Sequence, residues 1–143
     1  MAYWLMKSEP ETWSWDAQKK EGKAGAEWDG VRNYQARNNM RAMRQGDLAL
    51  FYHSGSERAC VGIVKVVEQA HPDSTDGSGQ WECVDVAAVA DLPRPVTLAE
   101  IKANPQLKDM VLVKNSRLSV QPVTASEWRK LCALGGLPNP PSA

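Results

Sequence analysis

Aromatic rings, side-chain amides and arginines are concentrated in one segment, residues 28–39, with the sequence WDGVRNYQARNN. A flat aromatic ring can hold the face of a nucleobase, an amide can read the edge of the base, and an arginine can meet a phosphate. The combination predicts a base-binding site that includes Trp28, Asn33 and Tyr34. The alternative is structural: a buried Trp and Tyr could anchor an ordinary capped helix, with the amides and arginines in solvent.

Three further segments carry polar groups that could face a ligand. His53 and Ser54 end the run FYHS, but adjacent strand residues point to opposite faces, so the two are poorly placed as a base and a nucleophile. We expect one of them to line the mouth of a pocket. Lys7 and Ser8 stand where proline stops an apolar run, and they either face a cavity or only end a strand. Arg117, in SRLS, either meets a phosphate or lies on a polar strand edge.

Charge is balanced overall but unevenly distributed. The 17 Lys and Arg residues match the 17 Asp and Glu residues, which argues against a domain that coats nucleic acid through bulk positive charge. Residues 32–44 nevertheless hold four arginines and no acid, and residues 102–130 hold six basic and two acidic residues. These stretches could supply a few phosphate contacts, or the arginines could be only the solvated side of a helix. The groups expected at the nucleic-acid backbone are Arg37, Arg41, Arg44, Arg117 and Ser119.

The composition is that of one globular domain. A chain of 143 residues can bury its own core, and 43% hydrophobic with 24% charged residues excludes disordered, collagen-like and coiled-coil chains. The three cysteines form no CxxC motif and there are only two histidines, so we expect a reduced cytoplasmic protein with no metal and no cofactor. We expect neither a signal peptide nor a membrane span.

Hydrophobic periodicity and turn residues predict an α+β fold with a mixed or antiparallel sheet curled into a barrel. Residues 71–80 (HPDSTDGSGQ) form a turn-rich loop that we expect to be the weakest part of the chain. The capping-box sequences at 97–100 and 124–127 predict helix starts. The expected strands are 3–7, 48–53, 60–69, 81–92, 110–113 and 118–123, and the expected helices are 15–21, 34–44, 98–103 and 125–134.

Five blocks of this sequence resemble the EVE domain family, which belongs to the PUA-like group. The blocks span nearly the whole chain: YWLMKSEPETWSW at 3–15, WDGVRNYQARNNM at 28–40, GDLALFYHS at 46–54, VGIVKVV at 61–67 and LVKNSRLSVQPVTASEW at 112–128. The resemblance implies a PUA-like β-barrel of five or six strands flanked by short helices over residues 1–137, followed by a flexible tail, 138–143. It also implies kinship with YTH domains, which hold a methylated base in an aromatic cage, and a role in reading modified bases.

The resemblance further implies a pocket for one base of DNA or RNA. The expected stacking ring is Trp28, with Trp13, Trp15 and Tyr34 as alternatives. We therefore predict a monomeric nucleic-acid reader that needs no membrane. Two alternatives stay open: an enzyme acting on a base or nucleotide through His53, Ser54 or Glu9, and a protein-interaction module. The implied pocket residues are Lys7, Ser8, Trp28, Gly30, Val31, Arg32, Asn33, Tyr34, His53 and Ser54, with Arg117 and Ser119 at the rim.

Overall fold

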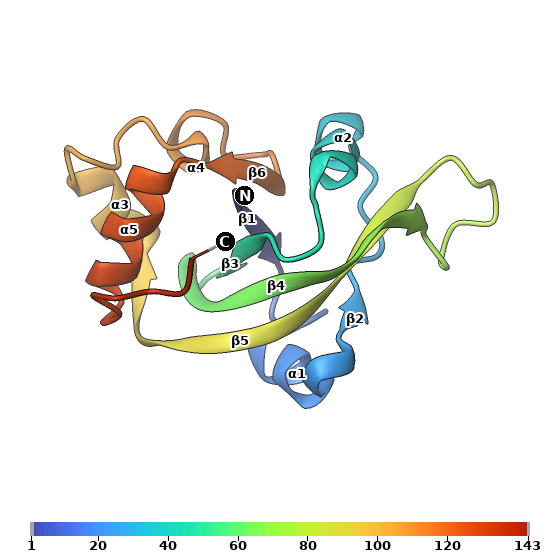
Figure 1. The fold of residues 1–143 in the computed structure, drawn as a ribbon. Helices are drawn as coiled ribbons and strands as arrows, with labels where there is room; N and C mark the ends of the chain where they lie inside the picture. Colours follow the sequence, from blue (N-terminus) through green and yellow to red (C-terminus); the bar gives the residue numbers. More distant parts are fainter. Residues whose placement is uncertain (1, 143) are drawn as a thin grey trace.

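A computed structural model describes residues 2–142 and contains one mixed six-stranded sheet with short helices packed against it (Figure 1). The strand order is β2-β5-β4-β3-β1-β6, and the β1–β3 pair is parallel while the other pairs are antiparallel. The expected α+β class is therefore confirmed. The strands are β1 (Tyr3–Ser8), β2 (Ala26–Glu27), β3 (Leu48–His53), β4 (Ala59–Pro72), β5 (Glu82–Thr97) and β6 (Val120–Val123).

The helices begin where the sequence offers an oxygen to their first free N–H groups. The side chains of Ser14 and Asn33 cap the first two α-helices, and Thr97 and Thr124 open capping boxes, as predicted. The α-helix predicted over 34–44 ends two residues earlier. The helices are α1 (Trp15–Lys20), the 3-10 helix η1 (Gly22–Ala24), α2 (Tyr34–Ala42), α3 (Leu98–Ala103), α4 (Val111–Lys114) and α5 (Ala125–Leu134).

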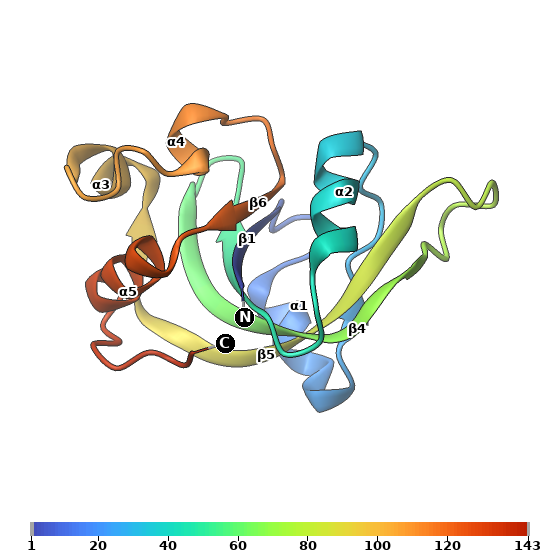
Figure 2. The same ribbon diagram turned by 45° about the horizontal axis from the view of Figure 1, so that its top comes forward.

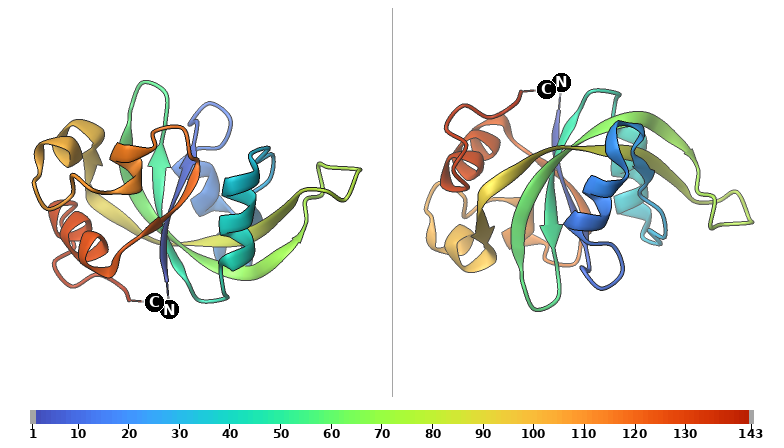
Figure 3. Two further views of the ribbon diagram at one scale, coloured as in Figure 1. Left: turned by 90° about the horizontal axis from the view of Figure 1, so that it is seen from above. Right: turned by 90° about the horizontal axis from the view of Figure 1, so that it is seen from below.

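The sheet carries a separate core on each face because alternate strand residues point in opposite directions. In β1, Trp4 and Met6 join the core that contains residues of α1 and α2, called the first core below. Leu5 joins the core that contains residues of α3, α4 and α5, called the second core. The views from above and below show these two groups of helices on different sides of the strands (Figure 3). The candidate site described below is built on the α1–α2 side.

The sheet is curved but it is not closed into a barrel, which corrects that part of the expectation. Strands β2 and β6 are its two ends, and β2 has only two residues to pair with β5. Helix α2 lies where a barrel would close, in contact with β4, β5 and β6 (Figure 2). The Asn39 amide donates a hydrogen bond to the Val120 carbonyl at 2.7 Å, so the helix satisfies part of the exposed strand edge.

Residues 110–113 form no strand. Val111–Lys114 is the single helical turn α4, which inserts Leu112 into the second core beside Met110. A short apolar run cannot be assigned to a strand or a helix by periodicity alone, and tertiary packing decides the outcome here.

Strands β4 and β5 continue beyond their predicted C-terminal ends, to Pro72 and Thr97. They form a long hairpin that projects from the body of the protein (Figures 1 and 3).

The three cysteines are buried and unpaired, as expected for thiols used as small apolar groups. Within residues 2–142 no helix combines the length and the apolar character needed to cross a bilayer. At the end of the described chain, the Trp128 indole donates a hydrogen bond to the carbonyl of Pro141 at 3.0 Å. The flexibility of the tail beyond residue 137 stays a prediction.

Gly62 in β4 is required by the position of the Trp15 indole. A methyl group on Gly62 would overlap three atoms of that ring, whereas a methyl group on Gly77, in the hairpin turn, would meet no atom within 4 Å. We expect Gly62→Ala to lower the free energy of unfolding by about 1–3 kcal/mol, the usual cost of overpacking a core. Urea denaturation measures this value. Gly77→Ala is the control and should leave stability nearly unchanged, and an equal effect of both substitutions would contradict the packing of Trp15 against β4.

Candidate functional site

A cavity of about 650 Å³ opens between the end of β1, the segment around β2 and the β4–β5 hairpin. Its volume lies within the range of roughly 300–1,000 Å³ that is typical of ligand sites. Four segments that are far apart in the sequence contribute to its walls. The lining residues are Lys7, Ser8, Glu9, Thr12, Trp13, Ala26, Glu27, Trp28, Asp29, Gly30, Val31, Arg32, Ser74 and Ser119.

Trp28 forms a fixed aromatic wall of the cavity. Its backbone N–H donates to the Val84 carbonyl of β5 at 2.8 Å, and its ring packs edge-on against Phe51 with centroids 5.4 Å apart. The side chain is held by the first core, and only 6% of the residue is exposed. Trp13 supplies a second indole to the lining and is itself anchored, because its N–H donates to Gln18 at 2.9 Å.

The six tryptophans divide into two groups by their indole N–H groups. Those of Trp4, Trp13, Trp15 and Trp128 donate hydrogen bonds to protein oxygens. No such bond is formed by the indoles of Trp28 and Trp81 anywhere in the described chain. A protein interior seldom leaves a polar group without a partner. Of these two residues, Trp28 lines the cavity.

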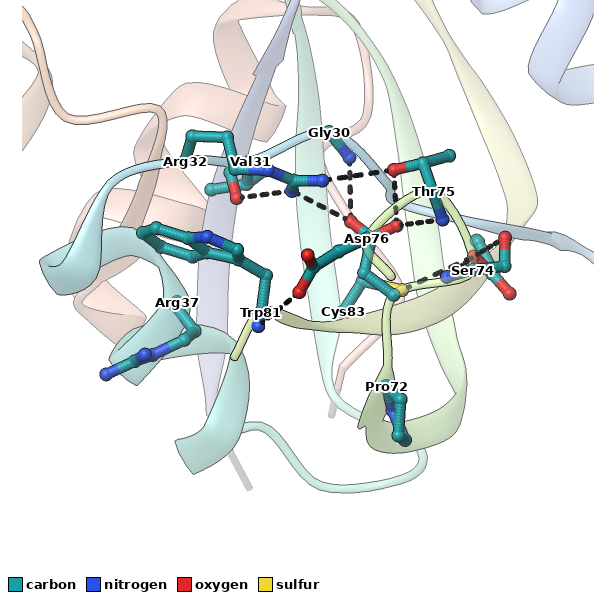
Figure 4. Close-up of polar contacts among 12 residues, drawn as sticks. Gly30, Val31, Arg32, Arg37, Pro72, Ser74, Thr75, Asp76, Trp81 and Cys83 are labelled. Atoms are coloured by element: carbon teal, nitrogen blue, oxygen red, sulfur yellow. Dashed lines mark hydrogen bonds and ion pairs between the residues drawn. The ribbon is translucent and has the colours of Figure 1, made fainter. Parts of the chain in front are cut away.

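The buried carboxylate of Asp73 ties the hairpin to the segment that carries Trp28. The Asp73 side chain is 1% exposed and accepts hydrogen bonds from the backbone N–H of Gly30 at 2.9 Å and from the Arg32 guanidinium at 3.2 Å. Its other oxygen accepts from the N–H and the hydroxyl of Thr75. These donors converge in Figure 4. Burial opposes ionisation of Asp73, but the bonds from Thr75, Gly30 and Arg32 outweigh burial and lower its pKa to about 2.

Carboxylates and cations both face the cavity. Burial, together with the negative charges of Asp73 and Glu27, raises the pKa of Asp29, while Arg32 partly opposes this effect. Burial lowers the pKa of Lys7, whose ammonium donates to the Ser116 carbonyl at 2.5 Å. The lining can thus accept hydrogen bonds from an amino group and also donate to a carbonyl or ring nitrogen.

The structure gathers seven of the predicted site residues around this one cavity. They come from three separate predicted segments, which the antiparallel pairing of β1 with β6 and the β2–β5 pairing help to bring together; the Lys7 N–H donates to the Ser119 carbonyl at 2.8 Å. Whether they contact a base stays a prediction. The seven residues are Lys7, Ser8, Trp28, Gly30, Val31, Arg32 and Ser119.

Four predicted pocket residues lie elsewhere. Asn33 caps α2 by accepting from the Ala36 N–H at 2.9 Å, and the half-exposed Tyr34 ring stacks on Trp81. His53 is 8% exposed, and its Nε2 accepts a hydrogen bond from the backbone N–H of Trp15 at 3.0 Å. Ser54 uses its backbone N–H to reach the Ser8 carbonyl at 2.9 Å. None of the four lines the cavity.

His53 has the contacts of a structural residue. Its Nε2 accepts a hydrogen bond from the Trp15 N–H, and its buried Nδ1 lies beside the Glu57 carboxylate without forming a hydrogen bond to it. Both ring nitrogens therefore point at protein groups. The geometry gives no support to an enzyme in which His53 acts on a molecule in the cavity.

The predicted backbone-binding arginines differ in how far their charge is compensated. Arg41 of α2 forms an ion pair with Glu82 at the start of β5. Arg37 instead donates to two neutral oxygens, the Gln80 carbonyl at 3.1 Å and the Asn38 amide. Arg44 and Arg117 are exposed. The phosphate role of all four stays a prediction.

Sequence reasoning missed the contribution of the hairpin. Ser74 lines the cavity and bonds to the Glu27 carboxylate, and Asp73 holds the hairpin in place, although residues 71–80 were expected to be the weakest part of the chain. A local signal existed, because an Asp followed two residues later by Thr favours a side-chain-to-backbone turn. Nothing local indicates that the same carboxylate would reach Gly30.

A second group of polar side chains lies beside the cavity wall. Glu27, His71, Cys83 and Asp85 bring four possible metal-ligand atoms within 4.8 Å of one another, although their sequence spacing matches no common zinc motif. His71 is already hydrogen-bonded to Asp85 at 2.7 Å. Burial and the neighbouring carboxylates raise the pKa of the Cys83 thiol, which keeps it protonated in this arrangement.

Replacing Asp73 with Asn should test the tie between the hairpin and the cavity. The folded-state pKa of Asp73 is below its unfolded value, so its ionisation stabilises the fold above about pH 4 and this contribution is lost as the pH falls toward 2. We expect wild type to exceed Asp73→Asn by about 2 kcal/mol in the free energy of unfolding at pH 7. The difference should shrink as the pH falls from about 4 to 2.

Chemical denaturation across that pH range measures both curves. Asp109→Asn is the matched control because the Asp109 side chain is 73% exposed, and its curve should follow wild type within about 0.5 kcal/mol. A difference between wild type and Asp73→Asn that does not change between pH 7 and pH 2 would contradict the assigned role.

Comparisons with known proteins agree with this architecture. Human thymocyte nuclear protein 1 is 39% identical over an alignment that covers 89% of this chain and 71% of that protein. A crystal structure of human THYN1 protein in complex with 5-methylcytosine-containing DNA superposes with a TM-score of 0.88 at 38% identity, covering 94% of this chain and 98% of that one. A crystal structure from Agrobacterium tumefaciens gives a TM-score of 0.98 at 57% identity, covering 100% and 99% of the two chains.

A more distant likeness extends to a YTH domain. The YTH domain of Zygosaccharomyces rouxii MRB1 protein, solved in complex with N6-methyladenosine RNA, has a TM-score of 0.59 at 20% identity, covering 99% of this chain and 87% of that one. At that identity the likeness shows a shared fold alone. The EVE domain family matches residues 2–134, nearly the full chain and all four segments that line the cavity. This chain therefore belongs to the EVE domain family.

Proposed function

We propose that this EVE domain binds nucleic acid and takes a single modified base into the cavity beside Trp28. The observation that carries the proposal is the fixed Trp28 indole, whose N–H has no protein acceptor within residues 2–142 and whose ring lines a cavity of about 650 Å³. The human relative at 38% identity, solved with DNA that contains 5-methylcytosine, supports the same class of ligand.

Each part of the cavity has a role in this proposal. Trp28 and Trp13 offer aromatic surface to the face of the base. Asp29 and Glu27 can accept hydrogen bonds from an exocyclic amino group, and Lys7 can donate to a ring nitrogen, a carbonyl or a phosphate. The hydrogen bonds determine which base binds, and apolar contact with the indole rings increases the affinity for a base that carries an added methyl group.

The selectivity for a methyl group should be modest. Extracting a base from a duplex costs a few kcal/mol, and stacking on one aromatic ring returns about 1–3 kcal/mol. Burying one methyl group adds roughly 0.8 kcal/mol, which corresponds to about fourfold in affinity. A single-stranded or mismatched base costs less to extract, so we expect tighter binding to single strands than to duplexes.

We also propose that the protein acts as a monomer in the cytoplasm.

Fluorescence anisotropy with short oligonucleotides tests the proposal. Single-stranded and duplex DNA and RNA would carry either one 5-methylcytosine or one cytosine. We expect about fourfold tighter binding of the methylated strand. Trp28→Phe keeps an apolar ring but removes the indole N–H, and it should weaken binding by about twofold to tenfold through the lost hydrogen bond.

Trp128→Phe is the matched control, because it makes the same chemical change at a buried indole in the other core. Near-UV circular dichroism would confirm that both variants are folded. Equal affinity for methylated and unmethylated strands, together with no effect of Trp28→Phe beyond that of Trp128→Phe, would overturn the proposal.

A further inference from the structure

An exposed pair of stacked aromatic rings lies beside the cavity but outside it. Tyr34, the first residue of α2, stacks on Trp81, the last residue of the hairpin turn before β5, with ring centroids 4.9 Å apart and an interplanar angle of 24°. Tyr34 is 56% exposed, and among the described residues Tyr34 and Val89 are the only exposed large hydrophobic side chains. Stacked aromatic surface in this position is available to a ligand.

The pair is held rigidly by the hairpin and α2. Gln80 donates from its amide to the Tyr34 hydroxyl at 2.7 Å, and Arg37 donates to the Gln80 carbonyl at 3.1 Å. The Arg37 guanidinium carbon lies 4.9 Å from the Tyr34 ring centroid and 5.4 Å from that of Trp81. A ligand would therefore meet a surface that is already ordered, which lowers the entropic cost of binding.

Arg32 joins this surface to the cavity. Its guanidinium carbon is 5.6 Å from the Trp81 ring centroid, and the same residue lines the cavity (Figure 4). A strand with one base in the cavity can thus pass Arg32 and reach Trp81 and Tyr34 with a neighbouring nucleotide.

Both signs of charge lie beside the rings: the Asp76 carboxylate accepts a hydrogen bond from the Trp81 backbone N–H at 2.9 Å, while three arginines supply positive charge. Arg32 is paired with Asp73 and Arg41 with Glu82, but no ion pair within residues 2–142 includes Arg37. Arg37 therefore keeps its net positive charge next to two aromatic faces. The first turn of α2 contains no acidic residue that would repel an anion. The Trp81 indole N–H adds a donor, since it has no protein acceptor in the described chain.

We propose that Tyr34, Trp81 and Arg37 form a second nucleotide site, at which a base that flanks the extracted one stacks on Tyr34 and the connecting phosphate meets Arg37. The proposal rests on the function proposed above. An extracted base leaves its neighbours without a stacking partner on one side, and an aromatic platform next to the cavity replaces that partner. The platform reads no sequence, because every base has a face that can stack.

A double-mutant cycle between protein and oligonucleotide tests this site. Two single strands carry a central 5-methylcytosine, one with normal flanking bases and one with abasic sites at both flanks. For wild type we expect the flanking bases to strengthen binding by about tenfold, as one stacked base does. For Tyr34→Ala that gain should fall below about twofold, whereas Tyr34→Phe should retain it.

Val89→Ala is the control, since it removes the other exposed large hydrophobic side chain and should keep the full effect of the flanking bases. Arg37→Gln provides an independent measurement that leaves Tyr34 intact. It should reduce the slope of log affinity against log salt concentration by about 0.7, the value for one phosphate contact on a single strand.

The outcomes separate this site from the proposed function. If wild type prefers 5-methylcytosine, but flanking bases increase its affinity no more than they increase that of Tyr34→Ala, the proposed second site is wrong and the proposed reader function stands. An unchanged salt slope in Arg37→Gln would likewise overturn the phosphate contact. If wild type shows no preference for the methylated strand, the reader function itself fails.

Discussion

The hydrogen bonds to the buried Asp73 carboxylate are the constraint on which the site depends. One oxygen joins the β4–β5 hairpin to Gly30 and Arg32, and the other closes the hairpin turn at Thr75. A buried charge is costly unless several donors surround it. Because these donors come from two distant parts of the chain, Asp73 is stable only when the hairpin and the segment after β2 are assembled together, and that assembly forms one wall of the cavity.

The use of tryptophan separates structural from ligand-facing positions. Four indoles give their N–H groups to protein oxygens, as Trp4 does to Asp47 and Trp15 to Asp91; of these four, only Trp13 also lines the cavity. Trp28 and Trp81 are fixed by their backbones and by ring contacts instead. Satisfied donors hold a fold together, whereas donors without a protein partner beside a cavity or an exposed ring pair are what a bound base can use.

The open sheet and the site have a common origin. In a closed barrel, β5 or β2 would pair with β6, and no room would be left for α2 at that edge. Here α2 fills the gap and places Asn39 on the β6 backbone and Tyr34 toward the hairpin. The segment that leads from β2 into α2 contributes Trp28, Gly30 and Arg32 to the cavity lining.

Local features were determined by the sequence itself: the strands at 3–8 and 48–53, the capped helices at 98–103 and 125–134, and the unusual polar and aromatic character of residues 28–39. These depend on periodicity and on side chains that bond their own backbone, which act over a few residues. Tertiary structure decided that 111–114 is helical, that His53 serves the Trp15 backbone, and that Asp73 reaches Gly30. Each of these outcomes depends on a partner 38 or more positions away, or on packing into a shared core. No local pattern encodes such a contact, because it exists only once the sheet has brought the segments together.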